Sequence, residues 1–283
     1  MGMGVARALL DRGFPVAVCD LIPEREAEAV AHGATREFRA LDVTITLVVD
    51  AVQTREVLET ETRDGPGFPW RKTPGPSLVM MCSTIAPSDT EAIAAGLAAR
   101  GIEMLDAPIS GGPARARAGT LSVMASGSDA AFERCAAVIE AMSAKCFRIG
   151  SRPGDGSRMK VVNNMLAAAN LAAGCEAMAM ASKLGLDLKQ AADVVNASSG
   201  ASWIFADRMA RALEGDYAPR AAARVLLKDV GLFVQEARNL GLTAPMAECA
   251  HAIFHDTVAR GFGEEDDAAV LKRYAEAWKA RLP

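Results

Sequence analysis

A lysine and two asparagines with helical spacing lie just past the middle of the chain. Lys160, Asn163 and Asn164 follow a loop with Pro153 and two glycines that can begin a helix, and apolar residues continue after them. Their i, i+3, i+4 spacing places an amine and two amides on one helix face. Burial among apolar neighbours lowers the pKa of a lysine, and such a lysine can exchange protons near neutral pH. The helix alone also fits a solvated lysine with the asparagines as local caps.

A second candidate segment, Asp106 to Pro113, comes directly after a predicted strand. Ser110 supplies a hydroxyl, and Gly111 and Gly112 supply backbone N–H groups that no side chain obstructs. A turn of this composition is suited to holding a carboxylate or a phosphate through backbone donors. A plain tight turn has the same composition, so this segment alone leaves binding and structural roles open.

The chain up to about residue 150 alternates apolar strand-like runs with helices. The predicted strands are 14–20, 42–49, 78–84, 102–107, 119–127 and 145–149, and the predicted helices are 1–10, 24–32, 53–58, 87–100 and 129–142. This alternation predicts a parallel sheet with helices on both faces. Residues 60–76, rich in glycine, proline and charge, are expected to form a surface loop.

The first of these units has part of the layout of a dinucleotide-binding βαβ motif. The motif runs strand, GxGxxG turn, helix, strand and acid, and the acid binds the ribose hydroxyls. The helix, the second strand and Asp20 are present, whereas the first strand and the first two glycines are not. Gly2 can only be the third glycine, the one that lets the helix pack closely.

The composition changes at 152/153, which predicts one domain at 1–152 and a helical domain at 153–283. The predicted helices are 156–184, 188–198, 204–214, 221–241, 245–260 and 267–281. The first of them is dense in small residues, so it is expected to be central and buried. Lys228 and Asp229 lie inside an apolar helical stretch, as a second functional lysine or as a charged pair on a partly wet face.

Composition excludes several classes of function. The 283 residues carry a net charge of −4, a pI near 5.6 and no Lys/Arg-rich run, which argues against nucleic-acid binding. No apolar run reaches about 20 residues and no signal peptide is present, so we expect a cytoplasmic protein without a membrane span. The six cysteines form no CxxC pair, which favours free thiols. His251 and His255 lack the HExxH pattern, so no metal site is expected.

Three motifs together resemble the β-hydroxyacid dehydrogenase family, which includes 3-hydroxyisobutyrate dehydrogenase and tartronate semialdehyde reductase. They are Asp106–Gly112, Gly156–Asn164 and Lys228-Asp229, in the order and spacing of the family over essentially the whole chain from Gly2. Further stretches are similar to the branch that acts on L-threonate: Ser122–Asp129, Ser202-Trp203, Gly215–Arg220 and Glu265–Val270.

The resemblance implies an α/β Rossmann-type doubly wound domain followed by an all-α domain like that of 6-phosphogluconate dehydrogenase, with the reaction in the cleft between them. It implies an NAD(P)-dependent dehydrogenase of a small hydroxy acid, with an L-threonate-like four-carbon sugar acid as the preferred substrate. The alternatives are 3-hydroxyisobutyrate dehydrogenase and tartronate semialdehyde reductase. Family members usually form homodimers or homotetramers.

The family also implies roles for single residues. Lys160 matches the catalytic lysine, and Asn164, one turn on, would orient the substrate. Ser110, Gly111 and Gly112 match the loop that holds the substrate carboxylate. The positions that match cofactor contacts are Gly2, Asp20, Val49, Thr84 and Lys228. Leu21 follows Asp20 where members that prefer NADP often carry arginine, which favours NAD, although Arg25 lies near.

The sequence departs from the family at its start. Members begin with a strand and a GLGxMG turn, whereas this chain starts at the third glycine of that turn. Either the sequence is truncated and its first strand is missing, or the chain as written binds its cofactor weakly. A binding or scaffold protein that has lost its nucleotide turn is the non-enzymatic alternative.

Overall fold

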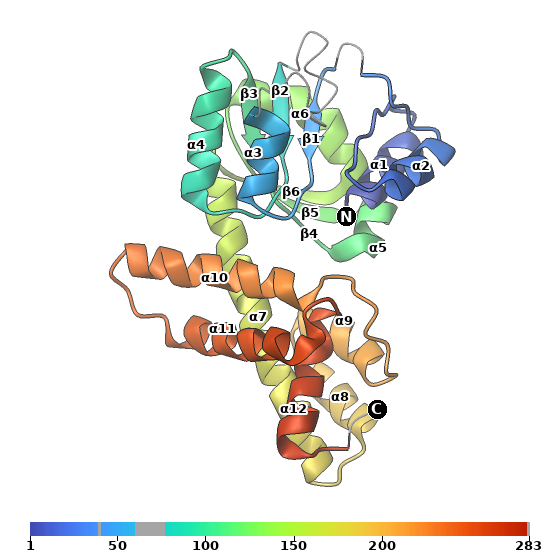
Figure 1. Ribbon diagram of the computed structural model, residues 1–283, viewed down its shortest axis with the longest axis vertical. Coiled ribbons are helices and arrows are strands. Elements are labelled where there is room, and N and C mark those ends of the chain that lie inside the picture. The colour runs from blue at the N-terminus through green and yellow to red at the C-terminus, as the bar shows by residue number, and fades with distance from the viewer. Residues whose placement is uncertain (39–40, 60–76, 282–283) are drawn as a thin grey trace. The chain divides into compact units, whose positions relative to one another are not determined.

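The computed structural model describes residues 1–38, 41–59 and 77–281, which form two compact units, Met1–Lys160 and Val161–Pro283 (Figure 1). We call them unit 1 and unit 2. The loop predicted at 60–76 lies outside the described residues. The long helix predicted at 156–184 is α7 (Asp155–Lys183), which crosses the division between the units. The domain boundary at 152/153 stays a prediction.

Unit 1 is built on a sheet with the strand order β1-β2-β3-β5-β4, in which β6 also pairs with β5. The strands are β1 (Thr44–Thr46), β2 (Leu78–Met81), β3 (Glu103–Asp106), β4 (Ile109–Ser110), β5 (Leu121–Ser126) and β6 (Ser143–Gly150). Along β2, Leu78 and Met80 enter one hydrophobic core, and Val79 and Met81 enter another. This alternation is expected of a strand that is covered on both faces.

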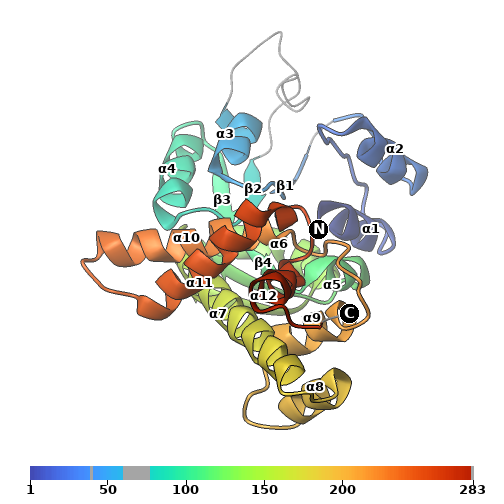
Figure 2. The same ribbon diagram turned by 60° about the horizontal axis from the view of Figure 1, so that its bottom comes forward.

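Helices cover both faces of the sheet, which confirms the doubly wound arrangement (Figure 2). The helix α3 (Ala51–Glu59) and the helix α4 (Pro87–Ala98) enclose the core that contains Val79. The opposite core is enclosed by α1 (Gly2–Leu10), α5 (Gly112–Ala118) and α6 (Asp129–Met142), and α2 (Pro23–Ala31) lies beside α1. The bounds of α6 equal the predicted ones, because Ser128 caps it by accepting the Ala131 N–H (3.0 Å).

The prediction of a parallel sheet is wrong, because the sheet is mixed. The strands β1, β2 and β3 are parallel, and β5 runs parallel to β6 but antiparallel to β3 and β4. After β4 the chain turns back through α5, a helix that is absent from the predicted elements, so β5 returns beside β3 and β4. The segment that forms α5, Gly112–Ala118, alternates alanine with arginine and has no apolar helical period.

The strand predicted at 14–20 is also wrong. Among the residues that the structure describes, this segment forms only an isolated parallel bridge, Ala17 to Thr35. One hydrogen bond runs from Val18 N–H to the Thr35 carbonyl and one from Thr35 N–H to the Val16 carbonyl, each 2.9 Å. A strand, however, requires a ladder of partners along its length, and this segment has only a short one.

Unit 2 is helical, as predicted, and its core forms around α7. The surrounding helices are α8 (Leu188–Asn196), α9 (Trp203–Ala212), α10 (Ala223–Asn239), α11 (Pro245–Thr257) and α12 (Val270–Trp278). Small residues let α9 approach α7 closely, since a Cβ on Gly174 would overlap the Phe205 ring. The helix α7 is long and apolar enough to cross a membrane, a property that the core helices of soluble proteins share. Its residues Leu171 and Met178 are buried in the unit 2 core.

Two of the predicted C-terminal helices are shorter than expected. In place of the helix predicted at 245–260, α11 ends at Thr257. A π-helical turn, Val258–Phe262, follows it, and Gly261 in this turn has φ +94°. The helix predicted at 267–281 starts as a 3₁₀ turn, Asp267–Ala269, and α12 ends before Lys279, which is left-handed. The left-handed conformation of Lys279 cannot continue an α-helix. After α11 the residue Val258 is still right-handed, and the first non-helical backbone angles are those of Gly261.

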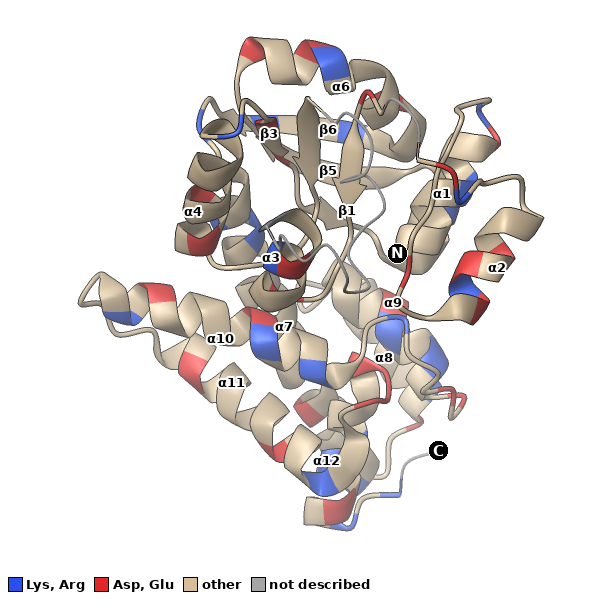
Figure 3. Ribbon diagram, turned by 45° about the horizontal axis from the view of Figure 1, so that its top comes forward, with Lys and Arg blue, Asp and Glu red and all other residues tan. Residues whose placement is uncertain are grey.

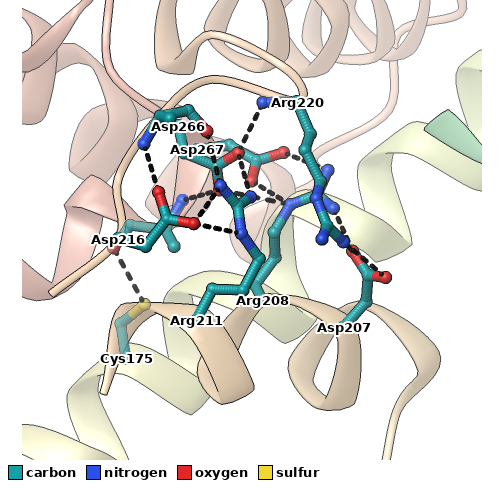
Figure 4. A network of polar contacts seen from close by, with 10 residues as sticks. Cys175, Asp207, Arg208, Arg211, Asp216, Arg220, Asp266 and Asp267 are labelled. Atoms are coloured by element: carbon teal, nitrogen blue, oxygen red, sulfur yellow. Dashed lines mark hydrogen bonds and ion pairs between the residues drawn. The ribbon is translucent and has the colours of Figure 1, made fainter. Parts of the chain in front are cut away.

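A buried ion network joins α9 to the two loops at 215–220 and 265–267 (Figure 4). The Arg208 guanidinium contacts Asp267 through Nε (2.5 Å) and Nη2 (3.3 Å), and its Nε lies 3.4 Å from Asp266 Oδ1. Arg211 pairs with Asp216 (2.7 Å), and the Arg220 N–H donates to Asp266 (2.8 Å). Burial raises the pKa of Asp267 to about 7, although Arg208 opposes this rise.

The charged residues of this network come from α9 and from two of the stretches that are similar to the L-threonate branch, Gly215–Arg220 and Glu265–Val270. A third stretch, Ser202-Trp203, starts α9, where Ser202 Oγ accepts the Phe205 N–H (3.2 Å). In this structure these residues therefore form structural contacts within unit 2. Elsewhere on the helices, basic and acidic residues are interspersed (Figure 3).

Candidate active site

The first turn of α7 is held by a carboxylate from β3. Asp106, fully buried at the end of β3, accepts the N–H groups of Gly154 (2.8 Å) and Ser157 (2.9 Å) through Oδ2 and the Ser157 hydroxyl (2.9 Å) through Oδ1. The first N–H groups of a helix have no partner within the helix, so Asp106 caps α7 from a distant strand. Burial raises the pKa of the Asp106 carboxyl, and these donors limit the rise.

Two hydroxyls from other elements complete this helix start. Ser126 Oγ, at the end of β5, accepts the Gly156 N–H (2.9 Å) and donates to Asp106 Oδ2 (3.3 Å). Thr90 Oγ1, on α4, lies 2.8 Å from Ser157 Oγ. Gly156 leaves no room for a side chain, since a Cβ there would lie 2.9 Å from the Asp106 carbonyl oxygen. Contacts with β3, β5 and α4 thus fix the start of α7.

Lys160 and Asn164 follow on α7, one turn apart and both buried, with exposed fractions of 7% and 8%. The i, i+4 spacing directs them to the same helix face, as the sequence predicted. Asn163 donates through Nδ2 to Asn164 Oδ1 (3.0 Å). Because α7 begins at Asp155, neither asparagine is a cap of the helix start.

In unit 2 a buried carboxylate links Asn164 to Lys228. Asp229, 4% exposed on α10, accepts from Asn164 Nδ2 (2.6 Å) through one oxygen and from Lys228 Nζ (2.6 Å) through the other. The hydrogen bond to Asp229 fixes the direction of the Asn164 amide, with Nδ2 toward Asp229 and Oδ1 toward Asn163. The sequence pattern indicated Asp229 only as a possible partner of Lys228 and indicated no role for Asp106, although both residues lie inside the motifs that resemble the family.

The segment from Ser110 to Gly112 combines the end of β4 with the start of α5. Ser110 pairs with Ser122 in the sheet. Gly111 has φ +133° and Gly112 has φ +74°, conformations that residues with a side chain rarely adopt. The backbone conformation therefore requires glycine at both positions. A turn that brings its N–H groups close to a ligand would have the same requirement.

The expected cofactor residues of unit 1 lie near the ends of its strands. Val49 follows β1 and Thr84 follows β2, so both belong to the edge formed by the carboxyl ends of the parallel strands. In open α/β sheets this edge is where dinucleotides bind. Asp20 follows the bridged segment; its carboxylate is exposed and accepts the Ile22 N–H (2.9 Å) through one oxygen.

Gly2 is the first residue of α1, whose first turn has no acidic residue. The close packing expected of Gly2 belongs to Gly4 instead, where a Cβ would lie 2.9 Å from Ala116 Cβ, whereas one on Gly2 would make only an ordinary contact of 3.7 Å with Leu47. An exposed carboxylate suits the ribose hydroxyls of a dinucleotide, and a helix start without acidic residues suits its phosphates. The residues present in this part of the chain therefore fit NAD.

Comparison with known proteins agrees with this arrangement. Residues 1–150 match the family described as the NAD-binding domain of 6-phosphogluconate dehydrogenase, and residues 154–274 match the one described as NAD-binding of NADP-dependent 3-hydroxyisobutyrate dehydrogenase. The L-threonate dehydrogenase of Escherichia coli (strain K12) is 41% identical, over 97% of this chain and 92% of that protein. The L-threonate dehydrogenase of Cupriavidus necator is 39% identical, over 96% of this chain and 92% of that protein.

A solved structure gives the same result for the fold. The crystal structure of 3-hydroxyisobutyrate dehydrogenase from Salmonella typhimurium has a TM-score of 0.88 and 40% sequence identity, and the match covers 96% of this chain and 95% of that one. These similarities confirm the Rossmann-type domain with a helical C-terminal domain, and NAD as the cofactor. The chain belongs to the 3-hydroxyisobutyrate dehydrogenase-like family and is an NAD-linked hydroxy acid dehydrogenase.

Proposed function

We propose that the chain oxidises L-threonate, or a closely similar four-carbon sugar acid, with Lys160 as the general acid/base. The observation that carries the role of Lys160 is its burial on α7, one turn before an asparagine whose amide is fixed by Asp229. The two L-threonate dehydrogenases that are about 40% identical support the substrate. 3-Hydroxyisobutyrate is the second candidate, because a 3-hydroxyisobutyrate dehydrogenase structure is also 40% identical.

Lys160 acts in its neutral form in the direction of oxidation. Its Nζ accepts the proton of the substrate hydroxyl while the carbon that bears this hydroxyl loses a hydride. NAD, when bound, supplies the acceptor for that hydride. In the direction of reduction the Lys160 ammonium returns the proton to the forming alkoxide, so the same residue serves both directions.

The remaining residues bind and orient. Ser110 and the N–H groups of Gly111 and Gly112 hold the substrate carboxylate. Asn164, held by Asp229, keeps the substrate hydroxyl within reach of Lys160.

The proposed cofactor contacts are spread along the chain. Gly2, Asp20, Val49 and Thr84 bind NAD, and Lys228 contacts it from α10. We propose a preference for NAD over NADP, since Asp20 carries a negative charge that a 2′-phosphate would meet and the neighbouring Leu21 is exposed.

We further propose a cytoplasmic homodimer or homotetramer. Unit 2 exposes large apolar side chains on α7 and directly after it, among them Leu166, Met180 and Leu184, with exposed fractions of 54%, 47% and 69%. Large apolar side chains exposed along one helix support a subunit interface on this helix. Light scattering of the purified protein measures the mass, and a monomer at micromolar concentration would contradict this part of the proposal.

The test of the proposed substrate is NADH formation with a panel of small hydroxy acids: L-threonate, D-erythronate, 3-hydroxyisobutyrate and glycerate, each with NAD and with NADP. We expect the highest kcat/KM for L-threonate with NAD. A higher value for 3-hydroxyisobutyrate would transfer the assignment to the second candidate, and no turnover of any of the four would refute it.

A further inference from the structure

Asp106 has no assigned role in the reaction, yet it organises the start of the helix that carries Lys160. It is fully buried and accepts four hydrogen bonds, from the Gly154 and Ser157 N–H groups and from the hydroxyls of Ser157 and Ser126. Every donor points to the carboxylate, so the ionised form suits the site. A buried carboxylate with this many donors is more than a helix cap requires.

The geometry connects this carboxylate to Lys160 through one turn of helix. Ser157 precedes Lys160 by three residues and Gly156 precedes it by four, so both lie on its face of α7. Asp106 and Ser126 therefore bind the backbone and side-chain atoms of the helical turn that directly precedes Lys160. A shift of the first turn would move Nζ by a similar amount, and a misplacement of about 1 Å can lower a rate about 100-fold.

The same carboxylate is joined to the substrate loop through the backbone. Asp106 ends β3, and Ser110 follows four residues later at the end of β4. The intervening residues are held in the sheet, since Ala107 N–H donates to the Met81 carbonyl (2.8 Å) and Met124 N–H donates to the Pro108 carbonyl (2.9 Å). One buried residue therefore holds both the start of α7 and the root of the loop that carries Ser110.

We propose that Asp106 is a positioning residue for the reaction: its carboxylate, with Ser126 and Ser157, sets the location of the Lys160 amine. This inference rests on the proposed role of Lys160 as the general acid/base. It does not place Asp106 in contact with substrate or cofactor, because its effect passes through the first turn of α7.

The test compares Asp106→Asn and Ser126→Ala with the wild-type enzyme, with L-threonate and NAD as the probes. Asparagine keeps one acceptor oxygen for the helix N–H groups but loses the charge. Ser126→Ala removes the acceptor for the Gly156 N–H and one of the four donors to Asp106, and it leaves the carboxylate in place. Activity is expressed per site that binds NADH, so that unfolded molecules do not enter the rate. Asp267→Asn, which changes a buried carboxylate of unit 2, is the matched control, and Lys160→Ala tests the proposed function itself.

We expect Asp106→Asn to lower kcat about 10-fold or more, with KM changed less than kcat and with a shifted pH profile of kcat, and Ser126→Ala to have a smaller effect of the same kind. Asp267→Asn should leave kcat unchanged. If Lys160→Ala is inactive but Asp106→Asn has the wild-type kcat per site, or a lower kcat with an unshifted pH profile, the positioning role is refuted and the proposed function stands. An active Lys160→Ala enzyme would refute both.

Discussion

The buried network of Arg208, Asp266 and Asp267 predicts an unusual dependence of stability on pH. The pKa of Asp267 is raised to about 7 in the folded protein by burial, from an ordinary value of 3.8, although Arg208 lowers it in part. Between these two values the folded protein holds a proton that the unfolded chain has lost. Stability should therefore decrease as the pH rises through this window, since it decreases wherever the folded state binds more protons.

The magnitude follows from the width of the window. Over the two pH units between pH 5 and the folded pKa near 7, a difference of one bound proton changes the free energy of unfolding by about 3 kcal/mol. In Asp267→Asn this titration is absent, and an asparagine resembles the protonated acid. The variant should thus match the wild-type protein near pH 5 and lose about 3 kcal/mol less than it by pH 8.

The measurement is urea unfolding of both proteins at pH 5, 6, 7 and 8, and the difference between their free energies of unfolding cancels the other titrating groups. Asp216→Asn is the control. It belongs to the same network but is exposed, and its pKa is lowered by hydrogen bonds from the Ala218 N–H and from Arg211, so it titrates below this range. Equal pH slopes for wild type and Asp267→Asn would refute the reasoning.

Three further predictions concern packing, the site and the cofactor. Gly174→Ala should destabilise unit 2 by about 1–3 kcal/mol, because its Cβ would overlap the Phe205 ring, and thermal unfolding measures this; an unchanged Tm would contradict the packing. Asp229→Asn should lower kcat/KM about 10- to 100-fold, because it weakens the charge-assisted hydrogen bonds to Asn164 and Lys228. Steady-state kinetics measures this, and a decrease of less than about threefold would contradict the prediction. Leu21→Arg should increase kcat/KM with NADP relative to NAD, and an unchanged ratio would argue against the proposed ribose site.

Local sequence signals predicted most elements and some of their bounds. The helix at 129–142 is an example, because the cap at Ser128 and the apolar period lie within one short window. The strand predicted at 14–20 was wrong for the opposite reason. Its composition is that of a strand, but whether a strand forms depends on the partner that lies beside it, which its own sequence does not contain.

The candidate site divides in the same way. Lys160 and Asn164 could be found because a helix converts their spacing into a shared face. Asp106 contacts Gly154 and Ser157, which lie 48 and 51 positions further along the chain, and Asp229 contacts Asn164 across 65 positions. No local sequence pattern predicts contacts over such separations. The stretches Gly215–Arg220 and Glu265–Val270 marked a branch of the family, and only the structure shows that they meet in a buried ion network.

The most direct test of the central claim is the rate of NADH formation from L-threonate by Lys160→Ala, compared with wild type at saturating substrate and with NADH binding measured on the same samples. If Lys160 is the general acid/base, kcat should fall by about 100- to 10,000-fold while NADH still binds. A variant that binds NADH and keeps more than about a tenth of the wild-type kcat would contradict the assignment.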